Sequence, residues 1–226
     1  MAGETVKSDA ICLDIRPWSR TSHVVLWLTP AGKVLTVVKG AVRPKSFFLG
    51  QYDLNYTCEM LYYARARGEV HALRECRPVR PRDFLRQNFR KLALAAHFRR
   101  LASDFAPQGG ECAGWYELLG AALDSLEAAG SLVVKLLAFE LKTLNLLGLS
   151  PELEAESGAF CLRGERRIPV SPEVAKCLRN PEAGIKNLQI PLDAARVIGV
   201  FYQSHLDCAF DVRRTVLGMI SETKEG

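Results

Sequence analysis

Apolar and polar residues alternate with a period of two in the first third of the chain, which is typical of half-buried β-strands. Five segments have this character: residues 11–15, 23–29, 33–39, 54–62 and 70–79. A Pro-Ala-Gly turn at 30–32 joins the second segment to the third as a hairpin. Five strands in about 70 residues predict a small closed barrel, because closure removes exposed strand edges.

The pattern changes near residue 80 to apolar residues spaced three and four apart, which predicts helices. Leu85, Phe89, Leu92 and Ala96 begin the first apolar stripe. Further helices are expected at 115–126, 132–147, 191–208 and 211–221, with an irregular segment at 150–172. The sequence therefore predicts an α+β protein: an N-terminal five-stranded OB-type β-barrel over residues 1–80, followed by an all-α helical domain over residues 81–226.

Composition fits an ordinary globular chain, since 48% of the 226 residues are hydrophobic and 24% are charged. The longest stretch without Asp, Glu, Lys or Arg is 12 residues, at 21–32, whereas a membrane-spanning helix needs about 20. Residues 1–9 lack the apolar core of a secretion signal. We therefore expect a cytoplasmic protein that does not cross a membrane.

Charge is distributed unevenly along the chain. Residues 1–110 carry 18 Lys and Arg against 9 Asp and Glu, whereas residues 111–226 carry 12 against 16. A basic front half favours contact with a polyanion such as a nucleic acid.

Sequence motifs for catalysis are missing. The four histidines have no metal-ligand spacing, and neither G-x-S-x-G nor G-x-G-x-x-G occurs. Gly109 and Gly114 have the separation of a phosphate loop, but Trp115 stands where that loop needs lysine. We expect no enzymatic activity and no cofactor.

Signals for nucleic-acid binding are stronger, because cations and aromatic residues occur together. The segment 39–46 places three cations within seven residues, and Phe47 and Phe48 follow directly. Arg16 and Arg20 flank Trp18 at the first strand connection. The alternative is a solvated loop whose two phenylalanines dock into the barrel, with Trp18 as a packing residue.

A cationic row is also expected on the first helix, where Arg82, Arg86 and Arg90 recur every four residues beside Lys91. Arg74, Arg77 and Arg80 on the fifth strand would continue it, although a helix face of this kind is often only solvated. The predicted DNA-binding residues are Arg16, Trp18, Arg20, Lys33, Lys39, Arg43, Lys45, Arg74, Arg86, Arg90 and Lys91.

Three motifs then resemble the bacterial RecO family. R-P-W-S-R-T-S-H at 16–23, L-T-P-A-G-K at 28–33 and V-K-G-A-V-R-P-K-S at 38–46 follow the order of that family's N-terminal barrel. Further along, Phe139-Glu140-Leu141 and Leu146-Leu147-Gly148 resemble its central-helix signature. The resemblance is most specific in residues 10–50, is weaker in 131–151 and is architectural elsewhere.

The resemblance implies a mediator of DNA repair and homologous recombination, associated with the bacterial nucleoid. Such proteins bind single- and double-stranded DNA, anneal complementary strands, contact the tail of single-strand-binding protein and load the recombinase with a RecR partner. The alternative is a non-catalytic adaptor of a repair or replication complex with little DNA affinity of its own.

Two departures from the family pattern change the expected sites. Many members carry a four-cysteine zinc site after the central helix, but the shortened segment 149–180 holds only Cys161 and Cys177, so we predict no zinc. Family members also carry basic residues before the Phe-Glu pair, where this chain has Leu137 and Ala138. Lys135 and Lys142, each about one helical turn away, are the predicted partner-binding residues.

Overall fold

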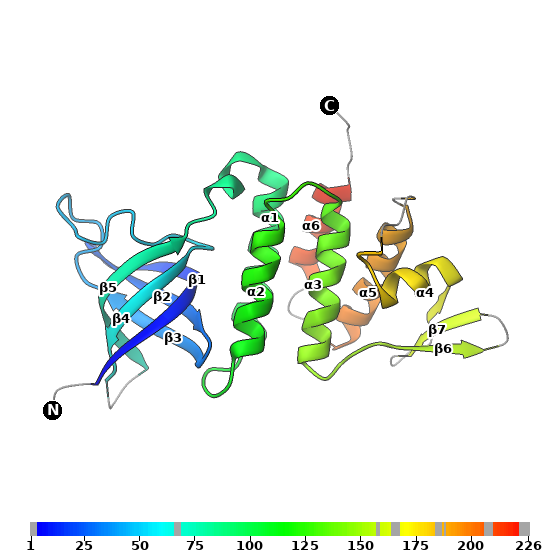
Figure 1. Ribbon diagram of the computed structural model, residues 1–226, viewed down its shortest axis with the longest axis horizontal. Coiled ribbons are helices and arrows are strands. Elements are labelled where there is room, and N and C mark those ends of the chain that lie inside the picture. The colour runs from blue at the N-terminus through cyan, green and yellow to red at the C-terminus, as the bar shows by residue number, and fades with distance from the viewer. Residues whose placement is uncertain are drawn as a thin grey trace. The chain divides into compact units, whose positions relative to one another are not determined.

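The computed structural model describes residues 4–65, 69–156, 159–163, 168–183, 187, 189–205 and 210–221 (Figure 1). The chain divides into two compact units. The first consists of residues 1–84 and 99–124, and the second of residues 85–98 and 125–226. These units follow packing, and the sequence-based boundary after residue 80 stays a prediction.

A closed five-stranded barrel forms most of the first unit, as the alternating pattern predicts (Figure 1). Its strands are β1 (Thr5–Ser19), β2 (Ser22–Thr29), β3 (Gly32–Val38), β4 (Thr57–Tyr63) and β5 (Val70–Arg80). The order around the barrel is β1-β2-β3-β5-β4, with β4 closing onto β1. Only the β3–β5 pair is parallel, and five strands closed in this way make an OB-type barrel.

Strand β1 is buried on both of its faces. Ala10 and Cys12 belong to the core inside the barrel. Ile11 points the other way, because successive side chains alternate, yet it is buried, as is Leu13 at the register shift between Cys12 and Asp14. Helix α2 (Ala113–Ser125) covers this outer face so closely that a Cβ added at Gly120 would lie 3.7 Å from Cδ1 of Ile11. Residues 99–124 therefore pack with the barrel because β1 has a second apolar face to cover.

The β2–β3 turn is docked against the connection between the helices of the first unit. The Thr29 hydroxyl closes the turn by donating to the Gly32 carbonyl at 2.8 Å. Gly32 has φ +124°, and a Cβ there would lie 2.8 Å from Cα of Gly109. The amide of Cys112 donates to the carbonyl of Pro30 at 2.9 Å. Glycine in the T-P-A-G-K motif thus allows the turn to pack directly against the backbone at Gly109.

The remaining elements are mostly helices. They are the 3-10 helix η1 (Asp83–Gln87), α1 (Phe89–Phe105), α3 (Leu132–Leu146), α4 (Pro172–Arg179), α5 (Gln189–His205) and α6 (Phe210–Ser221). Helix α3 begins after the N-cap Ser131, whose hydroxyl accepts from the Val134 amide, and ends before Gly148 with φ +70°. Among the described residues, no helix is long and apolar enough to cross a membrane.

The expectation of an irregular segment at 150–172 is wrong. This segment contains a three-stranded antiparallel sheet of β6 (Glu152–Glu156), β7 (Ala159–Arg163) and β8 (Ile168–Val170). Strands of five, five and three residues are too short to show a convincing period of two in the sequence.

The predicted first apolar stripe is also wrong in part. The helix is interrupted at Asn88, whose side chain accepts from the Lys91 amide and caps α1. This interruption shifts the helical phase, so Phe89 is 67% exposed and Leu92 is 38% exposed. Leu85 and Phe98 are buried as the pattern predicts, and Leu94, which the stripe left out, is buried as well.

A buried ion cluster holds the second unit together around Glu140 of α3. Arg213 of α6 donates from Nε to Oε1 at 2.8 Å and from Nη2 to Oε2 at 2.9 Å. Nε2 of His97, on α1, lies 3.0 Å from Oε1. Burial alone raises the pKa of the Glu140 carboxyl, but Arg213 and His97 outweigh it, so the pKa lies below its usual value. The family-like Phe-Glu-Leu signature therefore marks the centre of this unit.

Candidate nucleic-acid interface

Two loops that are distant in sequence meet at one end of the barrel. The amide of Val42, in the connection after β3, donates to the carbonyl of Thr21 in the β1–β2 turn at 3.3 Å. The amide of Gly40 donates to Oγ of Ser22 at 3.2 Å. Gly40 has φ +68°, a left-handed conformation that favours glycine at the point where the chain leaves β3. These contacts fix the two loops to each other.

Five cations lie on these two loops and the adjoining strand ends, and we call this set the basic loop surface: Arg16, Arg20, Lys39, Arg43 and Lys45. All five are exposed. Arg20 and Arg43 directly neighbour the two residues of the Thr21–Val42 hydrogen bond. Arg16 also pairs with Asp14 at 2.5 Å. The structure therefore brings together the cations that the sequence placed in two separate segments.

Two aromatic rings on the same loops point into solvent. Trp18 is 65% exposed, and the register shift between Pro17 and Ser19 makes it the extra residue of a β-bulge. Phe47 is 73% exposed, whereas Phe48 packs against the barrel core. The packing alternative is thus wrong for Trp18 and Phe47 and right for Phe48. Bulges often re-aim a side chain at a functional site.

Arg74 extends the basic loop surface along the β3–β5 pair. Because these strands are parallel and Val37 pairs with Ala72, Lys39 and Arg74 lie at equivalent positions two residues further on. Arg74 also lies over the ring of Tyr63 at 5.6 Å and pairs with Glu75 at 3.4 Å. It is exposed, so its charge remains available to solvent.

Lys33 lies at the opposite end of β3 from Lys39. Six residues of strand separate their Cα atoms by about 20 Å. The Lys33 ammonium donates to the Ser103 carbonyl at 2.8 Å, and its amide donates to the Pro107 carbonyl at 3.2 Å. Burial lowers the pKa of this lysine despite the nearby Asp104. The structure therefore uses Lys33 to dock the barrel turn and does not bring it to the basic loop surface.

The predicted cationic row on the first helix does not form as a continuous row. Arg82 precedes the helix with φ +56° and is buried, with Nε donating to Asp124 at 2.6 Å and Nη1 to the Asn55 carbonyl at 2.7 Å. Arg86 is exposed on η1, while Arg90 and Lys91 are half-buried at the start of α1. These last three belong to the second unit.

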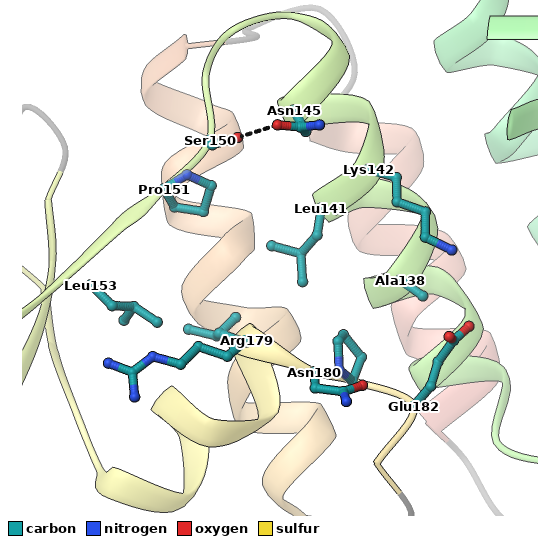
Figure 2. Close-up of a pocket in the computed structure, with 12 residues that line it drawn as sticks. Ala138, Leu141, Lys142, Asn145, Ser150, Pro151, Leu153, Arg179, Asn180 and Glu182 are labelled. Carbon is teal, nitrogen blue, oxygen red and sulfur yellow. Dashed lines mark hydrogen bonds between the residues drawn. The ribbon is translucent and has the colours of Figure 1, made fainter. Parts of the chain in front are cut away.

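The two predicted partner-binding lysines have different surroundings. The Lys135 ammonium donates to the carbonyls of Ser125 at 2.7 Å and Ala128 at 2.6 Å, so it ties down the segment before α3. Lys142 is exposed and lines a cavity of about 550 Å³ in the second unit (Figure 2). Of the two lysines, Lys142 is therefore the one that lines this cavity.

The cavity beside Lys142 combines an apolar wall with two cations and one carboxylate, that of Glu182. Its lining comes from α3, from the chain after α3 and from the end of α4: Ala138, Leu141, Lys142, Asn145, Ser150, Pro151, Leu153, Leu178, Arg179, Asn180, Pro181 and Glu182. Figure 2 shows the Ser150 hydroxyl donating to Asn145 at 3.0 Å at one side of it. Sequence reasoning missed Leu141 and Arg179, although Ala138, Leu141, Lys142 and Asn145 have the spacing of one helix face.

The expected absence of a zinc site stays a prediction, because the two cysteines of segment 149–180 are not both described. Cys177 is fully buried on α4, and the side chain of Cys161 and all of Cys208 lie outside the described residues. The part of the chain that the structure describes contains no group of three or more His, Cys, Asp and Glu side chains suited to a metal ion.

Comparison with known proteins adds an independent finding. The family model described as "Recombination protein O C terminal" matches residues 86–213. The protein named DNA repair protein RecO of Moorella thermoacetica is 30% identical over 177 residues, which cover 76% of this chain and 64% of that relative. The equally named protein of Roseiflexus is 26% identical over 197 residues, covering 86% and 68%. That of Alkaliphilus metalliredigens is 28% identical over 151 residues, covering 66% and 60%.

A closed OB-type barrel followed by a helical unit defines the class of protein. Within that class, the match over more than half of the residues shows that the chain belongs to the recombination protein O, or RecO, family. The chain spans less than two thirds of the length of the Moorella and Alkaliphilus relatives.

Proposed function

We propose that this protein acts in DNA repair and homologous recombination as a mediator without catalytic activity of its own. It binds single- and double-stranded DNA, anneals complementary strands and helps to load the recombinase with a RecR-like partner. One observation carries the DNA-binding part: the Thr21–Val42 contact gathers five exposed cations at one end of the barrel. The names of the relatives support the repair role.

The mechanism is electrostatic. Cations of the basic loop surface neutralise phosphates and release condensed counterions, so affinity falls as salt rises. Two complementary strands held against one positive surface repel each other less, which favours their encounter and pairing. No bond is made or broken in this step, in keeping with the absence of a catalytic motif in the sequence.

Fluorescence anisotropy on a labelled single-stranded oligonucleotide, titrated at several salt concentrations, tests the proposal. The double variant R43A/K45A is expected to bind all sequences more weakly and to lower the log–log salt slope by about 1.4, because each phosphate contact contributes about 0.7. R196A/R214A removes two exposed cations from α5 and α6 and is the matched control, since the net charge changes equally. Equal affinities and slopes in both variants would remove this loop from the site.

The second partner in the proposal is the acidic tail of single-strand-binding protein, which fits the cavity beside Lys142. Leu141, Pro151 and Leu178 offer apolar contacts. Lys142 and Arg179 supply two positive charges against the one negative charge of Glu182, so the lining is positive by one charge. Positive charge beside an apolar wall suits an acidic segment that also carries apolar side chains.

Binding of a tail peptide, measured by anisotropy, separates the two lysines. K142E is expected to weaken peptide binding without changing the melting temperature, because Lys142 is exposed. K135M is expected to lower the melting temperature and to leave peptide affinity unchanged, because its ammonium holds two backbone carbonyls. The opposite pattern would place the tail elsewhere.

The adaptor alternative makes a different prediction for the same oligonucleotide titration. It expects negligible DNA binding at about 0.15 M salt together with a stable complex with a RecR-like protein. That pair of results would replace the mediator proposal.

A further inference from the structure

We infer that Trp18 and Phe47 stack on unpaired nucleobases, so the basic loop surface distinguishes a single strand from a finished duplex. This inference rests on the proposed DNA-binding function and adds a selectivity that phosphate contacts alone do not give. In a duplex the base faces are covered by their neighbours, whereas a single strand offers them to an aromatic ring.

The exposure of Trp18 differs from that of the other two tryptophans. Of the three tryptophans, all within the described residues, Trp27 is fully buried and Trp115 is 6% exposed. Trp18 lies at the register shift between Pro17 and Ser19 of β1, and its ring faces solvent. Exposing a large ring gives up the free energy of burying it, so an exposed ring at a bulge favours a role in binding.

The ring of Phe47 has a packing contact on one side. Its ring makes an edge-on contact with Phe48 at 6.2 Å between centroids, and Phe48 is packed against the barrel core. Val42 and Leu49 of the same loop are also exposed apolar residues. A ring fixed in this way loses little conformational freedom when a base stacks on it.

A hollow of about 410 Å³ borders Phe47 and explains why we favour a nucleobase over a lipid chain. Its rim is polar, since Lys7 pairs with Glu59 at 2.9 Å and Arg77 lies 3.6 Å from the same carboxylate. Leu61 and Met60 also line it. A nucleobase has an apolar face and a polar edge, which this mixed lining suits, whereas an acyl chain would leave the ion pairs without solvation.

The selectivity has a consequence for annealing. Before pairing, each strand is held by both phosphates and bases. Once the strands pair, their bases stack on each other, and the ring contacts are lost while the phosphate contacts remain. The duplex product is therefore bound more weakly than its separate strands, which favours its release.

Paired affinity measurements on a single-stranded oligonucleotide and on its duplex test this inference. W18A and F47A are each expected to weaken single-strand binding roughly tenfold, and duplex binding by less than twofold. An oligonucleotide of the same length with abasic sites keeps the phosphates, and both variants should bind it as the wild type does. F89A, which removes a similarly exposed ring from α1, is the matched control and should leave the ratio unchanged.

Tryptophan fluorescence gives a readout independent of affinity. Oligo(dT) should quench the wild-type emission through Trp18, and W18F should abolish that quenching while single-strand binding persists. An unchanged single-strand to duplex ratio in W18A and F47A, with wild-type binding intact, would overturn the ring assignment but not the DNA-binding function. Loss of binding to anionic phosphatidylserine vesicles in these variants, without loss of oligonucleotide binding, would overturn it in favour of a membrane surface. Failure of the wild type to bind either DNA would overturn both proposals.

Discussion

The two ends of strand β3 carry lysines in equally recognisable motifs, yet the structure uses them differently. At the β2–β3 end, Lys33 donates to the Ser103 carbonyl and the turn packs against residues 107–112. At the other end, Lys39 is exposed and leads into the loop that meets the β1–β2 turn. One end is closed by the protein itself, and the other remains open to a partner.

The surroundings of a lysine therefore decide whether it packs within the protein or stays exposed for binding. Both motifs have a glycine with positive φ, Gly32 at +124° and Gly40 at +68°. A Cβ at Gly32 would meet the backbone of Gly109, whereas a Cβ at Gly40 would meet only the flexible side chain of Arg43 at 3.3 Å. The closed end is therefore held by close backbone packing as well as hydrogen bonds, whereas hydrogen bonds between two loops hold the open end.

The largest loss of stability is expected on replacing a buried charged residue, Glu140 in the second unit. E140Q leaves Arg213 buried without its counter-charge and should lower the free energy of unfolding at pH 7 by about 3–5 kcal/mol. Urea denaturation at several pH values measures it. The oligonucleotide affinity of the folded fraction should not change, whereas substitutions at the open end, such as R43A/K45A, should lower it.

The pH dependence of E140Q follows from the lowered pKa of Glu140. A carboxyl whose folded pKa is depressed stabilises the protein above its unfolded pKa, about 4.3, and loses that contribution as pH falls through the folded pKa. The stability gap between wild type and E140Q should thus be full at pH 7 and narrow below about pH 4. A gap independent of pH would contradict the internal ion pair.

The second largest loss of stability is expected when Gly32 is replaced, and the same replacement at Gly40 should cost less. G32A should lower the free energy of unfolding by about 3 kcal/mol, because the backbone conformation is strained for alanine and its Cβ would overlap Gly109. G40A should cost about 1 kcal/mol, the usual penalty for alanine in a left-handed conformation. Thermal and urea unfolding of both variants measures the difference, and equal losses would break the distinction between the two ends.

The smallest effects come from the two lysines. K33M should lower stability by about 1 kcal/mol through the lost bond to Ser103, with oligonucleotide affinity unchanged. K39M should leave stability unchanged and lower the salt slope of single-strand binding by about 0.7. If K33M weakened DNA binding as much as K39M, the closed end would also belong to the interface.

The barrel was predictable from sequence because its strands alternate strongly and are joined by recognisable turns, as at 30–32. The short sheet at 152–170 was not, because its strands are too brief to establish a period. The shifted phase of α1 depends on the cap at Asn88, a single residue that interrupts an otherwise continuous apolar pattern.

The candidate site was predictable only as a set of residue types. Sequence identified the cations and rings of segments 16–20 and 39–47, but the Thr21–Val42 bond that joins them is a tertiary contact. The structural roles of Lys33, Arg82 and Lys135 depend on carbonyls and carboxylates distant in sequence. No local pattern distinguishes such lysines and arginines from exposed ones.

Hydrogen–deuterium exchange of the whole chain, with and without a single-stranded oligonucleotide, tests whether DNA binds at the open end of the barrel. Binding at the open end predicts slower exchange in peptides covering residues 16–22 and 39–50, with no change at 29–33 or 103–112. Protection confined to 29–33 and 103–112, or an unchanged exchange pattern under conditions where the oligonucleotide is bound, would contradict the assignment of DNA binding to the open end of the barrel.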